Sequence, residues 1–358
     1  MRIIKYIFLL VLLAIIAVSV YVATQKGDFD VTHSTIINVP KSVLFNYMND
    51  YKNWEDWDSW KEDDGGMKFV YPENTVGKGA AYSWSGTNGN GKIITTFVKE
   101  NDSIAQKVVY GDNEADAYIT FKDTLGKTKV TWSSKGNVGF IAKVKATFSG
   151  GVNNMLETRF VRSLNNLNKV ITREINTFNV KVNGIVNNPG TFYVKQSTTC
   201  QTVDMQNRLL IMLPKIVRFF EKNKITMNGS PFVIYESNDP VNNTVTFSVC
   251  GPLREEIFLS PESDITVGKL EPYSALKTTL TGDYSHRSEA RKKAVEYMTQ
   301  NNILEYTTLK RIDVYVKSAS DVRYPSKWVT ELMIPVKTAA SPVIVTPPAQ
   351  VSEPIITQ

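Results

Sequence analysis

The feature that most constrains this chain is an uncharged apolar run near its start. Residues 6–23 contain no charged side chain and one clearly polar one, Ser19. As an α-helix rising about 1.5 Å per residue, this run is long enough to cross about 30 Å of hydrocarbon. Arg2 and Lys5 precede it, so the positive-inside rule places the N-terminus in the cytoplasm and the rest of the chain outside.

A cleaved signal peptide is the alternative to an uncleaved anchor, because the small residues at 17–19 could serve a signal peptidase. The apolar run continues through residues 20–22, beyond such a cut, which favours a membrane anchor over residues 1–27. In both cases the bulk of the chain is extracytoplasmic. That compartment is the periplasm if the source is a Gram-negative bacterium.

The composition excludes several classes of protein. The 358 residues are 42% hydrophobic, which suits about two folded domains. The 41 basic and 35 acidic residues are spread along the chain, without the dense basic stripe of a nucleic-acid binder. Cys200 and Cys250 are the only cysteines, and His33 and His286 the only histidines. The sequence thus offers no zinc cluster and little basis for a His-dependent nucleophile, and we expect no metal or other cofactor.

The C-terminal segment 338–358 differs in composition from the rest. It holds four prolines and shows neither helical nor strand periodicity. Proline at this density keeps the backbone extended and removes hydrogen-bond donors. We expect a disordered tail, with a short recognition motif as the alternative.

Residues 28–176 form the first predicted module. A strand-like run at 29–39 precedes Pro40, which opens a short helix, and six strand-like runs separated by turns follow between residues 68 and 136. Their spacing predicts an antiparallel meander. A long helix over 151–176 follows, with apolar residues every three or four positions at Leu156, Phe160, Leu164, Leu167 and Ile171. A curved sheet closed by this helix would leave a cavity between them.

Several motifs in this module resemble the SRPBCC (polyketide-cyclase/START-like) superfamily. They are residues 37–40 before an apolar helix, then Asn53-Trp54-x-x-Trp57-x-x-Trp60, and the closing helix at 160–167. The resemblance implies a helix-grip fold with an internal apolar pocket. Trp54, Trp57 and Trp60 either line the mouth of that pocket or anchor a loop against the core.

Six acids surround these tryptophans: Glu55, Asp56, Asp58, Glu62, Asp63 and Asp64. A cation site is one interpretation. The sequence favours the other, a solvated acidic loop.

The second predicted module, residues 189–337, follows a linker at 177–188 and contains an internal repeat. Each copy runs strand, helix, hairpin. The helices are expected at about 203–223 and 285–300, and the hairpins at 231–249 and 311–335. Such a duplication predicts a pseudo-two-fold sheet with helices on one face and a ligand groove at the axis. The complete fold class is therefore α+β, a helix-grip domain plus this duplicated module.

This module resembles the GyrI-like effector-binding family. The matching motifs are Gly282-x-Tyr284, then Asp313-x-Tyr315, and Glu331 before the strand end at 332–336. The resemblance implies that Glu331 faces a pocket, with Tyr315 and Tyr235 as aromatic walls. Alternation alone favours a half-exposed surface glutamate at position 331, and the resemblance favours the pocket. A pocket carboxylate implies as ligand a lipophilic cation or a molecule that offers a hydrogen-bond donor.

Three functions remain open. The leading one is membrane-anchored, non-enzymatic binding of small hydrophobic or amphipathic molecules, cations among them, since the two folds are known for cavities and no strong catalytic constellation is present. The second is hydrolysis of a small molecule, with Glu331 as general base and Tyr315 orienting water. The third is a structural or partner-docking role in the cell envelope.

A disulfide between Cys200 and Cys250 is a further option in an oxidising compartment. Cys200 precedes the helix of the first repeat and Cys250 ends its hairpin. A bridge requires their Cα atoms to lie within about 7 Å.

Overall fold

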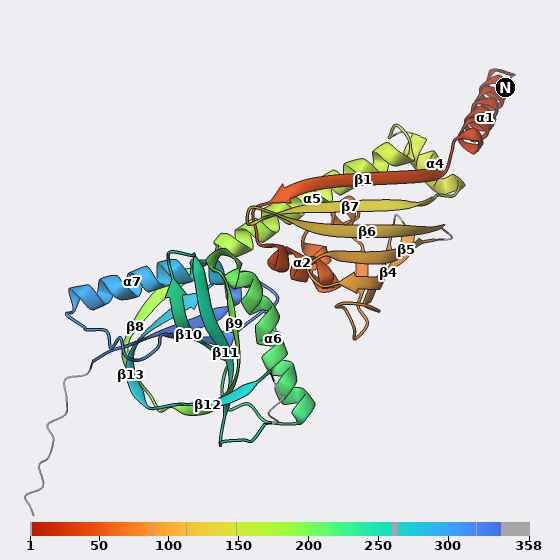
Figure 1. Ribbon diagram of the computed structural model, residues 1–358. Helices are drawn as coiled ribbons and strands as arrows, with labels where there is room; N and C mark the ends of the chain where they lie inside the picture. The colour runs from red at the N-terminus through yellow and green to blue at the C-terminus, as the bar shows by residue number, and fades with distance from the viewer. Residues whose placement is uncertain are drawn as a thin grey trace, which may run out of the picture.

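The computed structural model describes residues 2–87, 89–111, 113–147, 149–259, 264–319 and 321–337. Two antiparallel sheets, of seven and eight strands, lie one after the other along the chain, each with helices packed against it (Figure 1). This confirms the predicted α+β class with curved sheets. The segment 338–358 lies outside the described residues, so its disorder stays a prediction.

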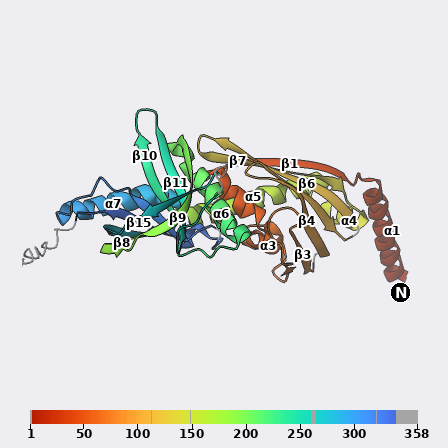
Figure 2. The same ribbon diagram turned by 60° about the horizontal axis from the view of Figure 1, so that its bottom comes forward.

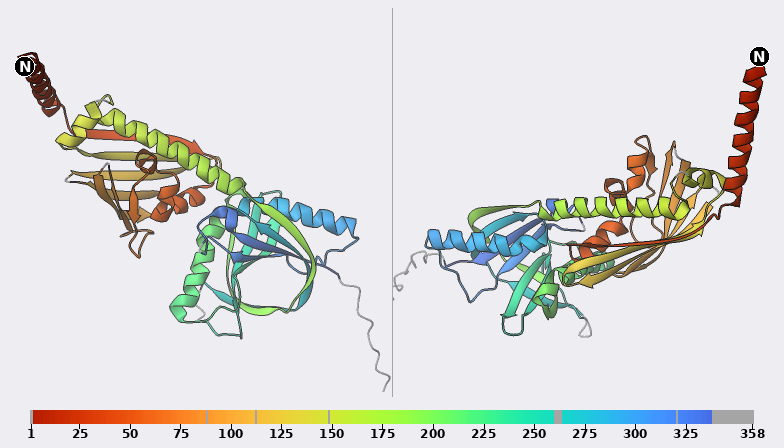
Figure 3. Two further views of the ribbon diagram at one scale, coloured as in Figure 1. Left: turned by 180° about the vertical axis from the view of Figure 1, so that it is seen from behind. Right: turned by 90° about the horizontal axis from the view of Figure 1, so that it is seen from above.

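The N-terminal helix α1 (Arg2–Thr24) projects from the end of the first sheet (Figure 3). Its segment Ile3–Thr24 is long and apolar enough to cross a membrane, and nearly all of its side chains are exposed. Val22, close to its end, is an exception and is fully buried. By length and composition, α1 fits either a membrane anchor or a signal sequence.

The first sheet is the predicted meander, with the strand order β1-β7-β6-β5-β4-β3-β2. Consecutive strands from β2 to β7 pair in antiparallel fashion, and β1 pairs with β7. The strands are β1 (Asp28–Ile37), β2 (Lys68–Val70), β3 (Ala81–Gly86), β4 (Gly89–Lys99), β5 (Ser103–Tyr110), β6 (Asn113–Thr124) and β7 (Lys127–Asn137).

The long helix α5 (Val152–Asn176) packs across this sheet, as its periodicity predicts. Phe160, Leu164, Leu167 and Ile171 are buried on its inner side. Shorter helices cover the rest of the same layer and enclose the space between α5 and the sheet. They are α2 (Lys41–Asn49), the 3-10 turn η1 (Tyr51–Asp56), α3 (Ser59–Asp63) and α4 (Phe140–Thr147).

The second sheet has the order β12-β9-β11-β10-β14-β15-β13-β8. Its central pair, β10 and β14, is flanked on each side by the matching strands of the two repeats, which confirms the predicted duplication. The strands are β8 (Asn179–Asn188), β9 (Thr191–Gln201), β10 (Phe232–Asp239), β11 (Thr244–Leu253), β12 (Thr266–Leu270), β13 (Tyr273–Thr281), β14 (Ile312–Lys317) and β15 (Val329–Pro335).

Two helices cover one face of this sheet. Helix α6 (Met205–Asn223) packs on β9 and β11, and α7 (Arg287–Gln300) packs on β13 and β8. Val233 of β10 belongs to the same buried cluster as Leu209 of α6, and Asp313 of β14 pairs with Arg291 of α7. Val233 and Asp313 lie directly opposite each other in the register of β10 and β14. Directly opposed residues share a face, so both helices lie on the same side, as predicted.

The predicted linker at 177–188 is wrong. Residues Asn179–Asn188 form β8, which pairs with β13 at the edge of the second sheet. Val180 and Val182 alternate with polar residues, so one face of the strand is half-buried against the sheet's own apolar clusters. Only two residues separate the end of α5 from the start of β8.

The two halves share one hydrophobic core. Buried residues from Phe29 in the first sheet to Trp328 beside the second belong to a single packed cluster. Helix α2 packs against α6, with a hydrogen bond of 2.6 Å from Ser42 Oγ to Asn207 Oδ1. Figure 2 shows α6 at the junction where the two halves meet.

Candidate functional site

A cavity of about 370 Å³ lies between the first sheet and its covering helices. Its walls are mainly aromatic and apolar, with a few polar groups placed among them. This is the composition expected of a small-molecule site. The lining side chains include Phe29, Trp54, Trp60, Met67, Phe69, Tyr82, Trp84, Ile93, Val108, Tyr110, Trp132, Met155, Leu156 and Phe160.

Two of the three predicted tryptophans line the cavity. Trp54 is held from η1 by a hydrogen bond of 2.8 Å from its Nε1 to the carbonyl oxygen of Met48, and Trp60 extends from α3. Trp57 is buried behind them, with its ring centroid 4.8 Å from that of Trp54. Trp54 and Trp60 therefore line the pocket, whereas Trp57 anchors its loop against the core.

Sequence reasoning missed the other aromatic walls. Tyr82 and Trp84 are two residues apart on β3 and so point to the same face, with ring centroids 5.6 Å apart. Trp132 of β7 stacks on Phe160 of α5 at 4.4 Å with the rings nearly parallel. The alternation of aromatic residues along β3 was the signal available in the sequence.

Arg159 of α5 lines this cavity as a cationic group, as does Lys145 of α4. Its guanidinium carbon lies 4.0 Å from the ring centroid of Trp60, and Nη2 lies 3.7 Å from a carboxylate oxygen of Asp63. Its Nη1 is buried and has no hydrogen-bond partner. The indole nitrogens of Trp84 and Trp132 are buried and unpartnered in the same way. All three groups are hydrogen-bond donors, so the cavity offers donors that a ligand's acceptor atoms could satisfy.

Asp58 supplies a buried carboxyl group to the same cavity. Its side chain caps α3 by accepting from the backbone nitrogen of Trp60 at 3.3 Å, and it accepts from Ser163 Oγ at 3.1 Å. Burial raises the pKa of Asp58 to about 7, although both hydrogen bonds and the charge of Arg159 oppose that rise. This carboxyl group therefore changes protonation near neutral pH.

The acidic run around the tryptophans is not a solvated loop as a whole, contrary to the favoured interpretation. Asp58 and Asp64 are buried, and Asp63 pairs with Arg162 at 2.7 Å. These side chains cap helices and pair with α5, which ties α3 to that helix. Within the described part of the chain, no group of three or more His, Cys, Asp or Glu side chains could hold a metal ion.

Tyr235 and Tyr315 come together in the second half, between the sheet and α7. Arg287 Nη1 donates to the hydroxyl of Tyr315 at 3.1 Å and to that of Tyr235 at 3.3 Å. Tyr235 donates to Asp313 at 2.5 Å, and Arg291 pairs with the same carboxylate at 3.0 Å. Burial, with the charge of Asp313, raises the pKa of Tyr235 to about 12, so this hydroxyl stays protonated.

Glu331 lies on the other face of the sheet. It pairs in register with Val314, whereas Tyr315 pairs with Thr330, and successive residues of a strand point to opposite faces. The predicted pairing of Glu331 with Tyr315, and with Tyr235, is therefore not formed. Glu331 instead contacts Lys277 at 2.5 Å on the face that carries no helix. An internal cation thus already neutralises the carboxylate that was predicted to take a cationic ligand.

The two cysteines do not approach each other. Cys200 of β9 pairs in register with Val245, and Cys250 of β11 pairs with Lys195. Five residues along the strand separate the two positions, about 17 Å at 3.4 Å per residue, well beyond a disulfide's span. Both thiols are free, so the bridge raised as an option is not formed.

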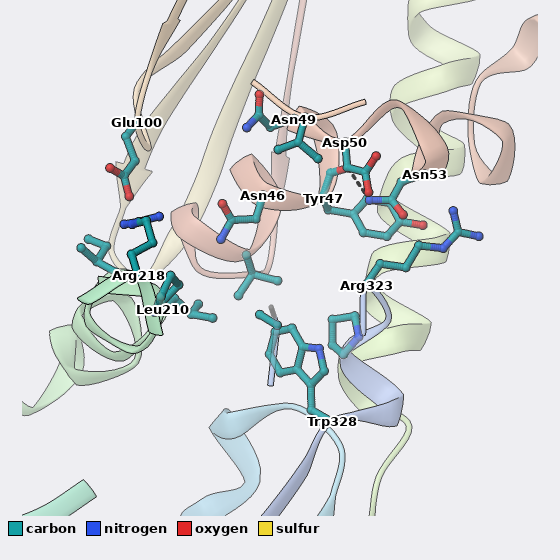
Figure 4. Close-up of a pocket in the computed structure, with 16 residues that line it drawn as sticks. Asn46, Tyr47, Asn49, Asp50, Asn53, Glu100, Leu210, Arg218, Arg323 and Trp328 are labelled. Carbon is teal, nitrogen blue, oxygen red and sulfur yellow. Dashed lines mark hydrogen bonds between the residues drawn. The ribbon is translucent and has the colours of Figure 1, made fainter. Parts of the chain in front are cut away.

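A second cavity, of about 250 Å³, lies where the two halves meet (Figure 4). Asn53 donates from Nδ2 to the carbonyl oxygen of Tyr47 at 2.8 Å, which fixes the orientation of its amide. Its Oδ1 is then buried without a partner, as is Oδ1 of Asn49. Trp328 forms another wall. The guanidinium groups of Arg218 and Arg323 also line this cleft, so it presents donors as well as acceptors.

Comparison with known proteins adds the following. No protein-family model matches the chain, and no curated protein does. Among solved structures, the EcmrR C-terminal domain is 14% identical, covering 45% of this chain and 99% of its own at a TM-score of 0.37. SAV2435 bound to tetraphenylphosphonium is 11% identical, covering 43% and 92% at 0.31. Protein CV1439 from Chromobacterium violaceum is 12% identical, covering 39% and 94% at 0.31. Likenesses at this level carry no argument about function.

Proposed function

We propose that the protein binds a small amphipathic molecule in the aromatic cavity, that α1 anchors it to a membrane, and that it does not transform its ligand. The buried, unpartnered Nη1 of Arg159, a residue that lines this mainly apolar cavity, is the observation that carries the proposal. A buried donor without a partner costs about 1–3 kcal/mol, more when charged. A ligand acceptor at this position removes that cost, and the aromatic walls bury the apolar body.

The donors favour an anionic or acceptor-rich head group. Arg159, Trp84 and Trp132 line the cavity and each has a buried N–H without a partner, whereas the carboxyl group of Asp58 is partly protonated at neutral pH. A carboxylate or phosphate head can accept from Arg159, while a cationic head would meet its guanidinium. We therefore place the ligand among anionic amphiphiles, which departs from the lipophilic cation expected at Glu331.

The membrane anchor and the extracytoplasmic position remain part of the proposal. Helix α1 is apolar and exposed over the length of a bilayer, and its charged flank is at the N-terminal end. The first half also retains its resemblance to SRPBCC domains, and the second its resemblance to GyrI-like domains. The hydrolytic alternative has no support in the geometry, because Glu331 and Tyr315 lie on opposite faces of the sheet.

Quenching of tryptophan fluorescence tests the binding directly. Full-length protein held in amphipathic polymer, without a bilayer, is titrated with a brominated long-chain fatty acid and with its methyl ester. We expect saturable quenching by the acid. Replacing Arg159 with Met weakens binding of the acid by about 10- to 100-fold, the range for losing a charged hydrogen-bond partner, and changes binding of the ester little.

Ala115→Phe is the matched control, because Ala115 lines the cavity and the larger ring occupies it. Quenching that persists unchanged in this variant would mean that the probe binds elsewhere. Equal affinity of the acid for the parent protein and for Arg159→Met would remove the basis for an anionic head group.

A further inference from the structure

The cavity opens beside helix α4. Ile141, Ala142 and Lys145 of this helix line the cavity. The side chain of Ile141 is nevertheless 76% exposed. A residue that both lines a cavity and lies mostly in solvent marks the place where the cavity meets the outside. The mouth is therefore at α4, next to the start of β6, which contributes Asn113 and Glu114.

This mouth lies at the end of α1. Helix α1 contacts α4, and the backbone nitrogen of Val138, just before α4, donates to the carbonyl oxygen of Gly27 at 2.9 Å. Only three residues separate the last residue of α1 from the first of β1. Figures 1 and 3 show α1 leaving the molecule beside α4. If α1 spans a bilayer, α4 lies at the surface of that bilayer.

The outer side of α4 has the chemistry of a membrane interface. Phe140 is 47% exposed and stands next to the exposed Ile141. Lys143 follows on the same helix, and Lys26 lies two residues after the end of α1. Adjacent apolar and basic side chains on a short helix suit insertion among lipid head groups, where the lysines meet anionic phosphates.

We propose that α4 lies in the interface of the membrane that α1 spans, and that the cavity takes its ligand, a lipid-derived anionic amphiphile, directly from that bilayer. This rests on the proposed function, because it assumes both the anchor and a ligand in the aromatic cavity. It adds the source of the ligand and the surface through which the ligand passes. Continuity with α1 is what identifies the bilayer, rather than another protein, as the partner of this exposed face.

Photo-crosslinking tests the position of α4. Full-length protein with a photoreactive benzoylphenylalanine in place of Ile141 is reconstituted into vesicles of phosphatidylethanolamine and phosphatidylglycerol and irradiated. We expect adducts with phospholipid. The matched control carries the same group in place of Leu125, which is 97% exposed in the turn between β6 and β7. That turn lies a strand length, about 40 Å, from α4, so no lipid adduct should form there.

Transfer of the brominated fatty acid from such vesicles tests the mouth. Phe140→Asp places a charge at the interface, on an exposed residue that is not part of the cavity lining, and should slow quenching by roughly ten-fold or more. The affinity measured without a bilayer should stay unchanged. Absence of lipid adducts at position 141, or unchanged transfer in Phe140→Asp, would overturn this inference. The binding measured in polymer would then still stand, whereas its absence would overturn the proposed function itself.

Discussion

Replacing Asp58 with Asn should make the protein more stable at alkaline pH and leave its stability at acid pH unchanged. The ordinary pKa of this carboxyl group is 3.8, and burial raises it to about 7 in the folded protein. Below pH 3.8 the carboxyl group is protonated in both the folded and the unfolded protein, so its ionisation does not reduce the free energy of unfolding. As the pH rises toward 7, the unfolded chain releases this proton and the folded protein keeps it, so stability falls.

This loss of stability is complete once the pH exceeds the folded-state pKa of about 7. The difference of about 3 pKa units, at 1.36 kcal/mol each, gives about 4 kcal/mol. The substituted asparagine cannot ionise, and its amide oxygen can still accept from the backbone of Trp60 and from Ser163. The variant should therefore match the parent near pH 4 and exceed it by up to about 4 kcal/mol at pH 8.

Urea unfolding of the full chain in detergent micelles, followed by tryptophan fluorescence from pH 4 to 8, measures this difference. Asp116→Asn is the control, because Asp116 is an exposed aspartate of β6 that pairs with Lys107 at the surface. Its stability should follow the parent at every pH. A variant at Asp58 that tracks the parent across the range, or is less stable at pH 8, would refute the assignment of a costly buried carboxylate.

Three further outcomes are expected. Gly91→Ala should reduce binding of the brominated acid, because a Cβ at Gly91 would lie 2.1 Å from the indole of Trp84 and must displace this wall of the cavity. Adding Trp84→Leu to the Gly91→Ala variant should restore part of the binding. Trp328→Ala should reduce the free energy of unfolding by about 3–5 kcal/mol. Because the two halves share one core, differential scanning calorimetry should still show a single unfolding transition, at a lower temperature. Peptide mapping without reduction should find Cys200 and Cys250 as free thiols, and a peptide joining them would contradict the strand register.

Much of the fold is predictable from the sequence because periodicity and turn residues act locally. The meander, the helix Val152–Asn176 and the duplicated order of strand, helix and hairpin all follow from such patterns. The prediction of a linker at 177–188 is wrong because β8 is half-buried, and its valines contact apolar clusters contributed by distant strands. A strand on a sheet edge carries little signal of its own.

The candidate site was less predictable. The tryptophan motif pointed to the cavity, but Arg159 appeared only as a polar position on an amphipathic helix. Its role depends on Trp60 and on the lack of an acceptor at Nη1, both of which are tertiary facts. Glu331 and Tyr315 could have been separated by alternation only with the register of β14 and β15, which the sequence does not reveal.

The short connection between α5 and β8 limits how the molecule can move. A bending motion between the halves needs a few residues free to change their backbone angles. Here the connection is Thr177 and Phe178, and the ring of Phe178 stacks on His286 at 3.6 Å. His286 also contacts the carbonyl oxygen of Ile175 at 2.9 Å. This packing restrains the backbone angles of the connection and so limits bending between the two sheets.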